Sequence, residues 1–446
     1  HNQKEENKNS KNLFFTGDNL EVLRHLQQNY ANSVDFIYID PPYNTGSDGF
    51  VYPDNFEYSD DQLKDMFALN DDELKRLKSI QGKATHDAWL TFMYPRLYLA
   101  KKVLKDTGVI FISIDDNEQA NLKLLMDEVF GESSFVGNLT WLKKRKGSFL
   151  SKKIISLTEN CLIYAKNNDD LICLFGGKAD DSESQPIIKR TNNYSELQFK
   201  KDTVKTKLKD GIYEKGVYGQ STTLVNLKND IEIKEGLIVT DFSLGSNFIW
   251  SQPFLDTELF KGGTVVINTL NFQPRVFRIF DEKNFKGFSS YIDGVKISGT
   301  NEDAYEELDK IFSQKNIFSY SKPVNYIIEL LRASTNFNKN ALVLDFFAGS
   351  STTADAVMQL NAEDGGNRQY IMCTLPEPTF TLNSDGKEVP TKGGEAAYKA
   401  GYKSIDEISR ERIRRAANKI KEENPLLTET QDFGFKHYRV VPPTQE

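Results

Sequence analysis

The sequence contains few of the residues that build disulfides and metal centres. Only three cysteines and four histidines occur among 446 residues. Cys161, Cys173 and Cys373 lie far apart, which excludes a disulfide framework and a cysteine-based zinc module. The histidines show no ligand spacing either. We therefore expect no metal site, and a reducing, cytoplasmic location for the protein.

Long apolar runs and an excess of positive charge are also missing. No stretch approaches the roughly 20 apolar residues that a membrane span needs, and the mean hydropathy is −0.52. We expect no association with a membrane. A net charge of −8 gives no global attraction to nucleic acid. The sequence contains no Walker A motif and no evident nuclease cluster.

The residues that are present indicate a large folded protein. Hydrophobic residues make up 39% of the chain and include 30 Phe, which excludes a disordered chain. The length suggests about three structural units of roughly 150 residues. Basic residues gather locally at 143–146, 200–209 and 410–415. Solvated faces would explain two of these groups, so composition alone does not decide for DNA.

Short apolar runs alternate with helical patterns at both ends of the chain. Near-continuous hydrophobicity at 13–15, 34–39 and 108–114 predicts parallel strands, with helical spacing at 19–28 and 91–104. This alternation predicts an α/β fold with a doubly wound, mostly parallel sheet. The alternation disappears in the middle of the chain, which indicates an inserted mixed or β-rich domain.

The predicted organisation is one α/β domain assembled from both ends of the chain. Its two halves span 12–135 and 316–403, and the inserted domain spans 136–315. A basic helix and a strand follow at 404–446. The polar, low-complexity segment 1–11 is interpreted as a mobile tail left by expression.

The first of two chemically suggestive loops is Asp40-Pro41-Pro42-Tyr43, directly after the predicted strand 34–39. Ligands of open α/β sheets bind beyond the carboxyl ends of strands. A carboxylate and a backbone carbonyl can accept both hydrogens of a nucleobase amine and so favour its attack on an electrophile. An aromatic ring can stack on the base, at about 1–3 kcal/mol. Asp40, Pro41 and Tyr43 supply these functions, and an ordinary turn with a surface tyrosine is the alternative.

The second loop runs from 345 to 353 and joins a predicted strand to a predicted helix. Its small residues let a ligand approach the backbone, and a helix N-terminus favours a carboxylate. The loop lacks the lysine of a P-loop and suits an adenosyl ligand with an amino-acid tail, with a plain tight turn as the alternative. Asp18 and Glu377 follow other strands and are candidates for ribose or adenine binding, or else a helix cap and a solvated residue.

Together the two loops resemble those of amino-directed DNA methyltransferases that use S-adenosylmethionine. Residues 40–43 are similar to their catalytic DPPY motif, and Asp345 to Gly349 to their cofactor motif. The catalytic motif comes first, which is the circularly permuted β-class order with target recognition between the two halves. Further segments resemble the modification (Mod) subunit of type III restriction-modification systems: 16–23, 37–46, 50–52, 317–323, 375–377 and 432–435.

The resemblance implies transfer of a methyl group to adenine N6 in double-stranded DNA by base flipping, without a metal. Asp40, Pro41, Pro42 and Tyr43 would hold and stack the flipped adenine, and Lys322 would meet the methionine carboxylate. The residues implied to bind S-adenosylmethionine are Asp18, Lys322, Pro323, Asp345, Phe346, Phe347, Ala348, Gly349, Ser350, Thr352 and Glu377. Those implied to bind DNA are Trp141, Lys143, Lys144, Arg145 and Lys146, where a core role for Trp141 is the alternative.

Two departures from the family and several alternatives remain. Ser351 stands where the family usually has a second glycine, and a positive φ would be unfavourable for it. Family members usually continue beyond Glu446. The implied partners are a second copy of the chain and a restriction (Res) subunit that would perform cleavage. The alternative functions are cytosine-N4 methylation, whose enzymes more often have serine in place of Asp40, and a non-catalytic DNA-recognition subunit.

Overall fold

The computed structural model describes residues 1–45, 60–61, 64, 70–79, 85–147, 151–179, 182–220, 223–279 and 284–440. Some predictions fall partly outside these residues, namely the ranges 12–135, 136–315 and 404–446. Residue 46 and the segment 50–52, which contribute to the family resemblance, also lie outside them. The chain divides into two compact units, one made of His1–Phe175 and Gly287–Glu446, the other of Gly176–Lys286. None of the described helices is long and apolar enough to cross a membrane.

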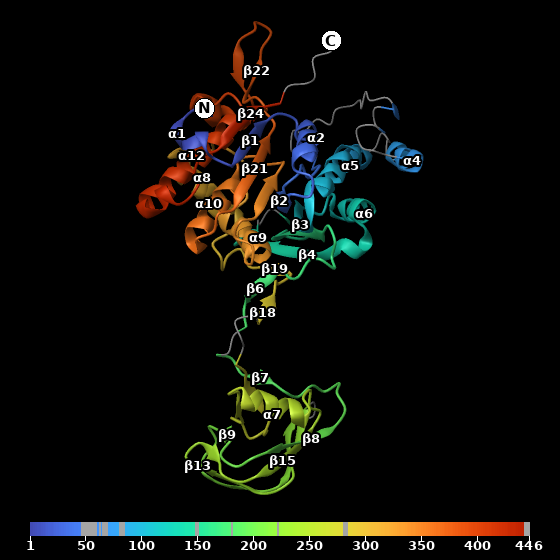
Figure 1. Ribbon diagram of the computed structural model, residues 1–446, viewed down its shortest axis with the longest axis vertical. Coiled ribbons are helices and arrows are strands. Elements are labelled where there is room, and N and C mark those ends of the chain that lie inside the picture. Colours follow the sequence, from blue (N-terminus) through green and yellow to red (C-terminus); the bar gives the residue numbers. More distant parts are fainter. Residues whose placement is uncertain are drawn as a thin grey trace. The chain divides into compact units, whose positions relative to one another are not determined.

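A nine-stranded sheet forms the centre of the first unit, in the order β19-β4-β5-β3-β2-β20-β21-β1-β24 (Figure 1). Its strands are β1 (Leu13–Thr16), β2 (Val34–Ile39), β3 (Leu104–Ile114), β4 (Phe135–Leu142), β5 (Thr158–Ala165), β19 (Tyr291–Ile292), β20 (Leu342–Asp345), β21 (Gln369–Thr374) and β24 (Lys436–Arg439). From β3 to β24 the strands run parallel, as the continuous apolar runs predict, whereas β5 is antiparallel to β3 and β4.

Helices cover both faces of this sheet, so the first unit is a doubly wound α/β structure (Figure 1). Helices α2, α5 and α6 pack on one face, and α9, α10 and α12 on the other. The helices are α1 (Glu5–Lys8), α2 (Asn19–Asn29), α4 (Asp71–Ser79), α5 (Thr85–Val103), α6 (Gln119–Phe130), α8 (Asn301–Phe312), α9 (Val324–Thr335), α10 (Thr352–Asp364), α11 (Glu395–Lys399) and α12 (Ile405–Glu423). The described residues of the unit also form the 3-10 turns η1 (Glu132–Ser134) and η2 (Pro425–Glu429) and the hairpin of β22 (Phe380–Leu382) and β23 (Glu388–Pro390).

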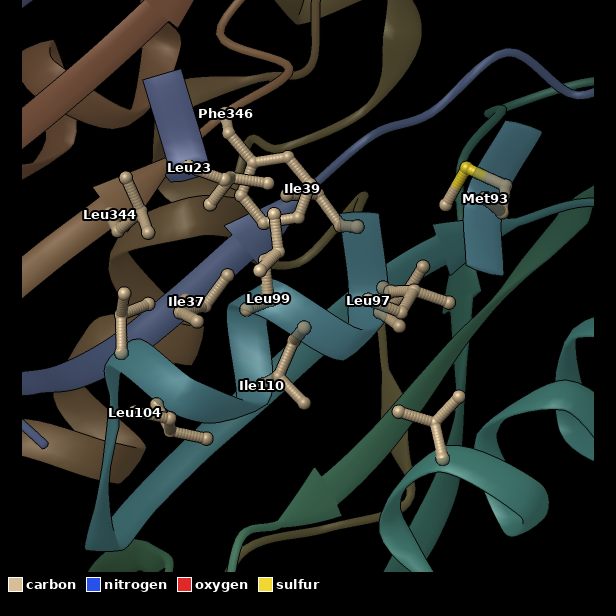
Figure 2. Close-up of a cluster of buried hydrophobic side chains, with 14 of the residues drawn as sticks. Leu23, Ile37, Ile39, Met93, Leu97, Leu99, Leu104, Ile110, Leu344 and Phe346 are labelled. Atoms are coloured by element: carbon tan, nitrogen blue, oxygen red, sulfur yellow. The ribbon is translucent and has the colours of Figure 1, made fainter. Parts of the chain in front are cut away.

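Strand β2 shows why the sheet needs helices on both sides. Its successive side chains point to opposite faces, so Ile37 and Ile39 join one core while Phe36 and Tyr38 join the other. The first core includes Leu344 of the neighbouring strand β20, as Figure 2 shows. Burying each of these side chains contributes about 1.5–3 kcal/mol. The two cores thus hold β2 in place at the centre of the sheet.

The second unit consists of two antiparallel or mixed sheets around one core. A seven-stranded sheet has the order β10-β13-β14-β9-β16-β17-β7, and a four-stranded sheet the order β11-β12-β15-β8. The elements are β7 (Gln185–Pro186), β8 (Ser195–Phe199), β9 (Val204–Lys205), β10 (Gly211–Tyr213), β11 (Gly216–Gln220), β12 (Thr223–Leu227), β13 (Ile231–Lys234), β14 (Leu237–Ile238), β15 (Phe242–Ser246), α7 (Gln252–Phe260), β16 (Thr264–Val266) and β17 (Arg275–Phe277). The chain passes between the units along β6 (Phe175–Lys178) and β18 (Phe285–Gly287), which pair with each other.

The second unit is narrower than the range 136–315 that the sequence predicted for the insertion. β4 and β5 pair with each other, and β5 continues the large sheet beside β3. Helix α8 also belongs to the first unit. Helix-strand alternation therefore stops near residue 136 because the sheet becomes antiparallel there. The boundary between the two units lies elsewhere, at residue 175.

The interpretation of residues 1–11 as a mobile tail is wrong. Asn7 is buried, and its side-chain oxygen accepts a hydrogen bond from the backbone N–H of Phe435 at 3.1 Å. Asn2 exchanges two hydrogen bonds with the backbone of His437, at 2.7 and 3.0 Å. Side-chain amides thus pair with the backbone of the last strand and of the residue before it. The polar composition that suggested disorder supplies these bonds.

Candidate active site

The predicted catalytic and cofactor loops leave the sheet from neighbouring strands. β2 and β20 pair in parallel, with Ile37 opposite Leu344, so their carboxyl ends lie at one edge of the sheet. Asp40 follows β2 directly, and Asp345 is the last residue of β20. Burial, together with the nearby charge of Asp40, raises the pKa of Asp345 to about 7. The fold therefore brings together two acidic loops from opposite ends of the chain.

Asp40 and Tyr43 belong to a cluster of charged side chains. The Tyr43 hydroxyl lies 2.6 Å from Asp40 Oδ1 and 2.5 Å from Glu159 Oε1 of β5. Lys322 Nζ, just before α9, donates to Asp40 Oδ2 and to the Tyr43 hydroxyl, both at 2.9 Å. The same ammonium group lies 3.1 Å from Glu159 Oε1, and Lys143 Nζ lies 3.1 Å from Glu159 Oε2. The carboxylate–ammonium cluster thus comprises Asp40, Tyr43, Lys143, Glu159 and Lys322.

The two carboxyls of this cluster differ in proton affinity. Burial raises the pKa of Asp40 against the attraction of Lys322, and the charge of Glu159 raises it further. Burial also acts on Glu159, but the charges of Lys322 and Lys143 oppose it and leave the pKa of Glu159 below its usual value. The Asp40 side chain is 23% exposed and that of Glu159 only 6%. Asp40 is therefore the carboxyl that a ligand reaches and that takes up a proton more readily.

Residues from α5 and from the start of α6 hold the turn after Asp40 in place. The indole N–H of the buried Trp89 donates a hydrogen bond to the carbonyl of Pro42 at 2.7 Å. Asn44 has a left-handed backbone with φ +58°, and its side-chain amide donates to the buried Glu118 at 2.7 Å. His86 Nδ1 lies 2.6 Å from the same carboxylate oxygen. Sequence reasoning missed these supports because no local pattern links them to the loop.

The cofactor loop is fixed by its own strand acid. Asp345 Oδ1 accepts a hydrogen bond from the backbone N–H of Phe347 at 3.0 Å, and Oδ2 accepts one from the Thr353 hydroxyl at 2.6 Å. Ser351 adopts φ +62°, the conformation considered unfavourable for it, at a cost of about 1–2 kcal/mol. Its hydroxyl is hydrogen-bonded to that of Ser409 of α12 at 2.6 Å, which offsets part of this cost.

A fully buried arginine supports the same loop from behind. Arg412 of α12 donates from Nη1 to the hydroxyls of Thr352 (2.8 Å), Ser350 (3.0 Å) and Ser321 (3.1 Å). Its Nη2 lies 3.2 Å from the carboxylate of Asp355, which is also buried. Sequence reasoning grouped Arg412 with a basic face of the last helix. The periodicity of that helix places it inward, beside Ile408 and Ala416, which is the signal that could have identified it.

The remaining predicted cofactor residues lie in different surroundings. Asp18 caps α2 by accepting from the N–H of Leu20 at 2.7 Å, while half of its side chain stays exposed. Glu377 is exposed after β21. Phe346 is 1% exposed and packs in the core beside Leu23, as Figure 2 shows. Phe347 is partly exposed, Ala348 is buried, and Pro323 is the N-cap residue of α9.

The structure places several of the predicted ligand residues in contact with other side chains. Trp141 is 1% exposed, stacks on Tyr326 at 4.5 Å and donates to the carbonyl of Gly299, so it is a core residue. Lys143 is committed to Glu159, and Arg145 pairs with Asp303. Lys144 and Lys146 form no ion pair with a described residue. Lys322, expected at the cofactor carboxylate, lies instead on Asp40 of the catalytic loop.

A family model described as DNA methylase (N6_N4_Mtase) matches residues 34–419, a range that contains both loops and the inserted unit. The chain belongs to this DNA methylase family. It is 45% identical over 455 residues to the StyLTI Mod subunit, a type III restriction-modification enzyme of Salmonella typhimurium, covering 100% of this chain and 63% of the relative. Identity to the EcoPI Mod subunit of Escherichia phage P1 is 37%, covering 98% and 66%.

A shorter relative matches over most of its length. The type II methyltransferase M.KpnI of Klebsiella pneumoniae is 30% identical, with 96% of this chain and 90% of the relative covered. The chain thus spans about two thirds of the first two Mod relatives, and nearly all of a methylase that is named as a type II enzyme. The resemblance to type III Mod subunits inferred from the sequence is confirmed.

Proposed function

We propose that the protein is an S-adenosylmethionine-dependent DNA methyltransferase that modifies adenine N6 in duplex DNA. One observation carries the proposal: the Asp40 and Asp345 loops, from opposite ends of the chain, share one edge of the sheet on adjacent parallel strands. This is the position at which open α/β sheets bind ligands. The order of these loops supports a circularly permuted β-class methyltransferase.

The Asp40 loop suits an amine acceptor. The carboxylate of Asp40 and the carbonyl of Pro41 would accept the two amine hydrogens, which returns electron density to the nitrogen for attack. Pro41 and Pro42 donate no backbone hydrogen bonds of their own, and Trp89 holds the carbonyl of Pro42. The amine proton is lost to Asp40, whose raised pKa suits a proton acceptor. Tyr43 would stack on the extruded base.

The Asp345 loop fits the proposed cofactor. The hydroxyls of Ser321, Ser350 and Thr352 gather at the N-terminus of α10, which favours a carboxylate. The buried Nε of Arg412 has no hydrogen-bond partner among the described residues, so this arginine keeps one unused donor behind the loop. The exposed Glu377 would be available for ribose hydroxyls, whereas Asp18 already caps α2 and pairs with Arg96 at 3.3 Å. When bound, S-adenosylmethionine supplies an electrophilic methyl group to this edge of the sheet.

The rest of the proposal concerns DNA and partner proteins. The unit 176–286 would read the target sequence, and Lys144 and Lys146 would bind phosphate. By analogy with the Mod relatives, the protein would be the modification component of a restriction-modification system. The family resemblance of the sequence further implies a homodimer, a restriction (Res) subunit and a cytoplasmic location. Cytosine-N4 methylation is the second candidate, because the matching family model carries both N6 and N4 in its name.

The test is incubation of the protein with tritiated S-adenosylmethionine and duplexes of mixed sequence, followed by digestion and separation of the bases. We expect label on adenine N6, and its loss in Asp40→Ala with DNA binding retained. Label on cytosine would establish the second candidate. A protein that transfers no label and shows no heat of cofactor binding in calorimetry would be a non-catalytic DNA-recognition subunit.

A further inference from the structure

Glu159 has no role in the reaction described so far, yet it contacts Tyr43 and Lys322, the two side chains that bind the Asp40 carboxylate among the described residues. Its carboxylate is 6% exposed and lies 2.5 Å from the Tyr43 hydroxyl and 3.1 Å from Lys322 Nζ. The same hydroxyl and the same ammonium group hold the two oxygens of Asp40 at 2.6 and 2.9 Å. The two carboxyls are therefore joined twice, through Tyr43 and through Lys322.

We propose that Glu159 is a positioning residue of this site, which fixes the place and the charge of Asp40 through the Tyr43 hydroxyl and Lys322. The proposal rests on the proposed methyl transfer. Tyr43 has a single hydroxyl proton but makes short O···O contacts to two carboxyls, and it already accepts a hydrogen bond from Lys322. The Tyr43 hydroxyl can therefore donate to only one of the two carboxyls at a time. The two carboxyls thus share one hydroxyl donor and one ammonium group, so a change at Glu159 alters the hydrogen bonding of Asp40.

The net charge of the cluster explains why Glu159 is needed. Asp40 alone would neutralise Lys322 and leave the partly buried Lys143 without an acid, which is unfavourable. With Glu159 present, two ammonium groups face two carboxyls. Asp40 then keeps Lys322 as a partner and still accepts a proton, because the charge of Glu159 counters part of the attraction of Lys322.

The groups that surround Asp40 set the direction of its titration. Glu159 opposes ionisation of Asp40, whereas Lys322 favours it. The other titratable groups facing the cluster are Tyr38 of β2, Tyr43, Asp115 after β3, Lys143 after β4, Cys161 of β5, Tyr326 of α9 and Asp345 of β20. Burial raises the pKa of Tyr38, Tyr43, Cys161 and Tyr326, so these groups stay neutral where Asp40 titrates. Removing Glu159 and removing Lys322 should therefore move the titration of Asp40 in opposite directions.

The experiment measures the single-turnover methylation rate against pH at saturating duplex for wild type, Glu159→Gln and Lys322→Met. The matched control is Asp127→Asn. Asp127 also accepts hydrogen bonds from a tyrosine hydroxyl, Tyr164 at 2.6 Å, and from a lysine, but it lies on α6 away from the site. We expect Glu159→Gln to lower the rate about ten- to hundredfold and to move the acidic limb of the profile to lower pH. Lys322→Met should move that limb to higher pH, and Asp127→Asn should match wild type.

A second readout separates this inference from the proposed function. Infrared difference titration of the cofactor-free protein follows the protonated carboxyl band that Asp40→Asn removes. The same opposite shifts are expected there, whether or not the protein methylates DNA. If Glu159→Gln fails to fold, Glu159→Gln/Lys143→Met restores charge balance and takes its place. Titrations of Asp40 that do not move, or that move in the same direction in both variants, would overturn the proposal. If the variants show these opposite shifts but the wild-type protein transfers no methyl group, only the proposed function is overturned.

Discussion

Replacing Arg412 by methionine tests whether helix α12 supports the cofactor loop. Methionine keeps the buried stem but removes the donors to Thr352, Ser350 and Ser321, and it leaves Asp355 buried without its ion-pair partner. Breaking a buried ion pair by removing one partner costs about 3–5 kcal/mol. A typical domain has about 5–15 kcal/mol of stability in total. We therefore expect a folded but strongly destabilised protein with weaker cofactor binding.

The assay must report the first unit alone, because two units need not unfold together. Two of the three tryptophans, Trp89 and Trp141, lie buried in that unit, and Trp250 lies in the second. In a Trp250→Phe background, tryptophan fluorescence during urea unfolding follows the first unit. Calorimetry then measures the binding of S-adenosylmethionine to the same variants.

Arg414, on the same helix, provides the control. It pairs with Glu411 three residues away, and both side chains are partly exposed, so Arg414→Met should cost only about 0–1 kcal/mol. Adding Asp355→Leu to Arg412→Met removes the unpaired charge and should recover part of the lost stability. The reasoning is refuted if Arg412→Met costs no more than Arg414→Met and the cofactor binds both with wild-type affinity.

Three further substitutions test the loops themselves. Because the folded pKa of Asp345 is raised to about 7, native protein holds a proton there that the unfolded chain releases at lower pH. Its ionisation destabilises the fold as pH rises from about 4, the usual pKa of an aspartate, to about 7. Asp345→Asn should therefore gain stability relative to wild type over this range in urea unfolding, with a nearly constant difference above it. A difference that is constant from about pH 4 to about pH 7 would contradict this. Ser351→Gly should be about 1 kcal/mol more stable than Ser351→Ala by thermal unfolding, because glycine adopts the positive φ without strain. Both variants lose the hydrogen bond to Ser409. Equal stabilities would count against backbone strain at this position. Trp89→Phe leaves the Pro42 carbonyl without its donor and should lower the free energy of unfolding by about 1–3 kcal/mol. The single-turnover methylation rate should also fall. An unchanged rate would show that the turn does not depend on this hydrogen bond.

The parts of the site that lie on buried parallel strands could be predicted from the sequence. Ile37 and Ile39 belong to a continuous apolar run, which indicates a strand covered on both faces, and the acid directly after such a strand lies at the ligand-binding edge. The same reasoning placed Asp345. In both cases the strand and its terminal acid are adjacent in sequence, so a local pattern contains the information.

The long-range charge pairs could not be predicted in this way. Glu159 sits in an ordinary strand pattern, and its partners Tyr43 and Lys322 come from remote segments. The run 143–146 looked like one basic surface, but Lys143 and Arg145 pair with different acids. Composition shows how many charges a segment carries. Whether a lysine is free to bind phosphate depends on the acid that pairs with it, and the tertiary fold determines that acid.

The short segment before α9 explains why both ends of the chain must act as one site. Pro323 disfavours a helical backbone at the residue before it, so Lys322 continues the non-helical approach to α9. Side chains of successive residues in an extended backbone point to opposite sides. Ser321 accordingly joins the hydroxyls of Ser350 and Thr352, while Lys322 turns to Asp40. Two adjacent residues, joined by a single peptide unit, thus connect the proposed methyl-donor and methyl-acceptor loops.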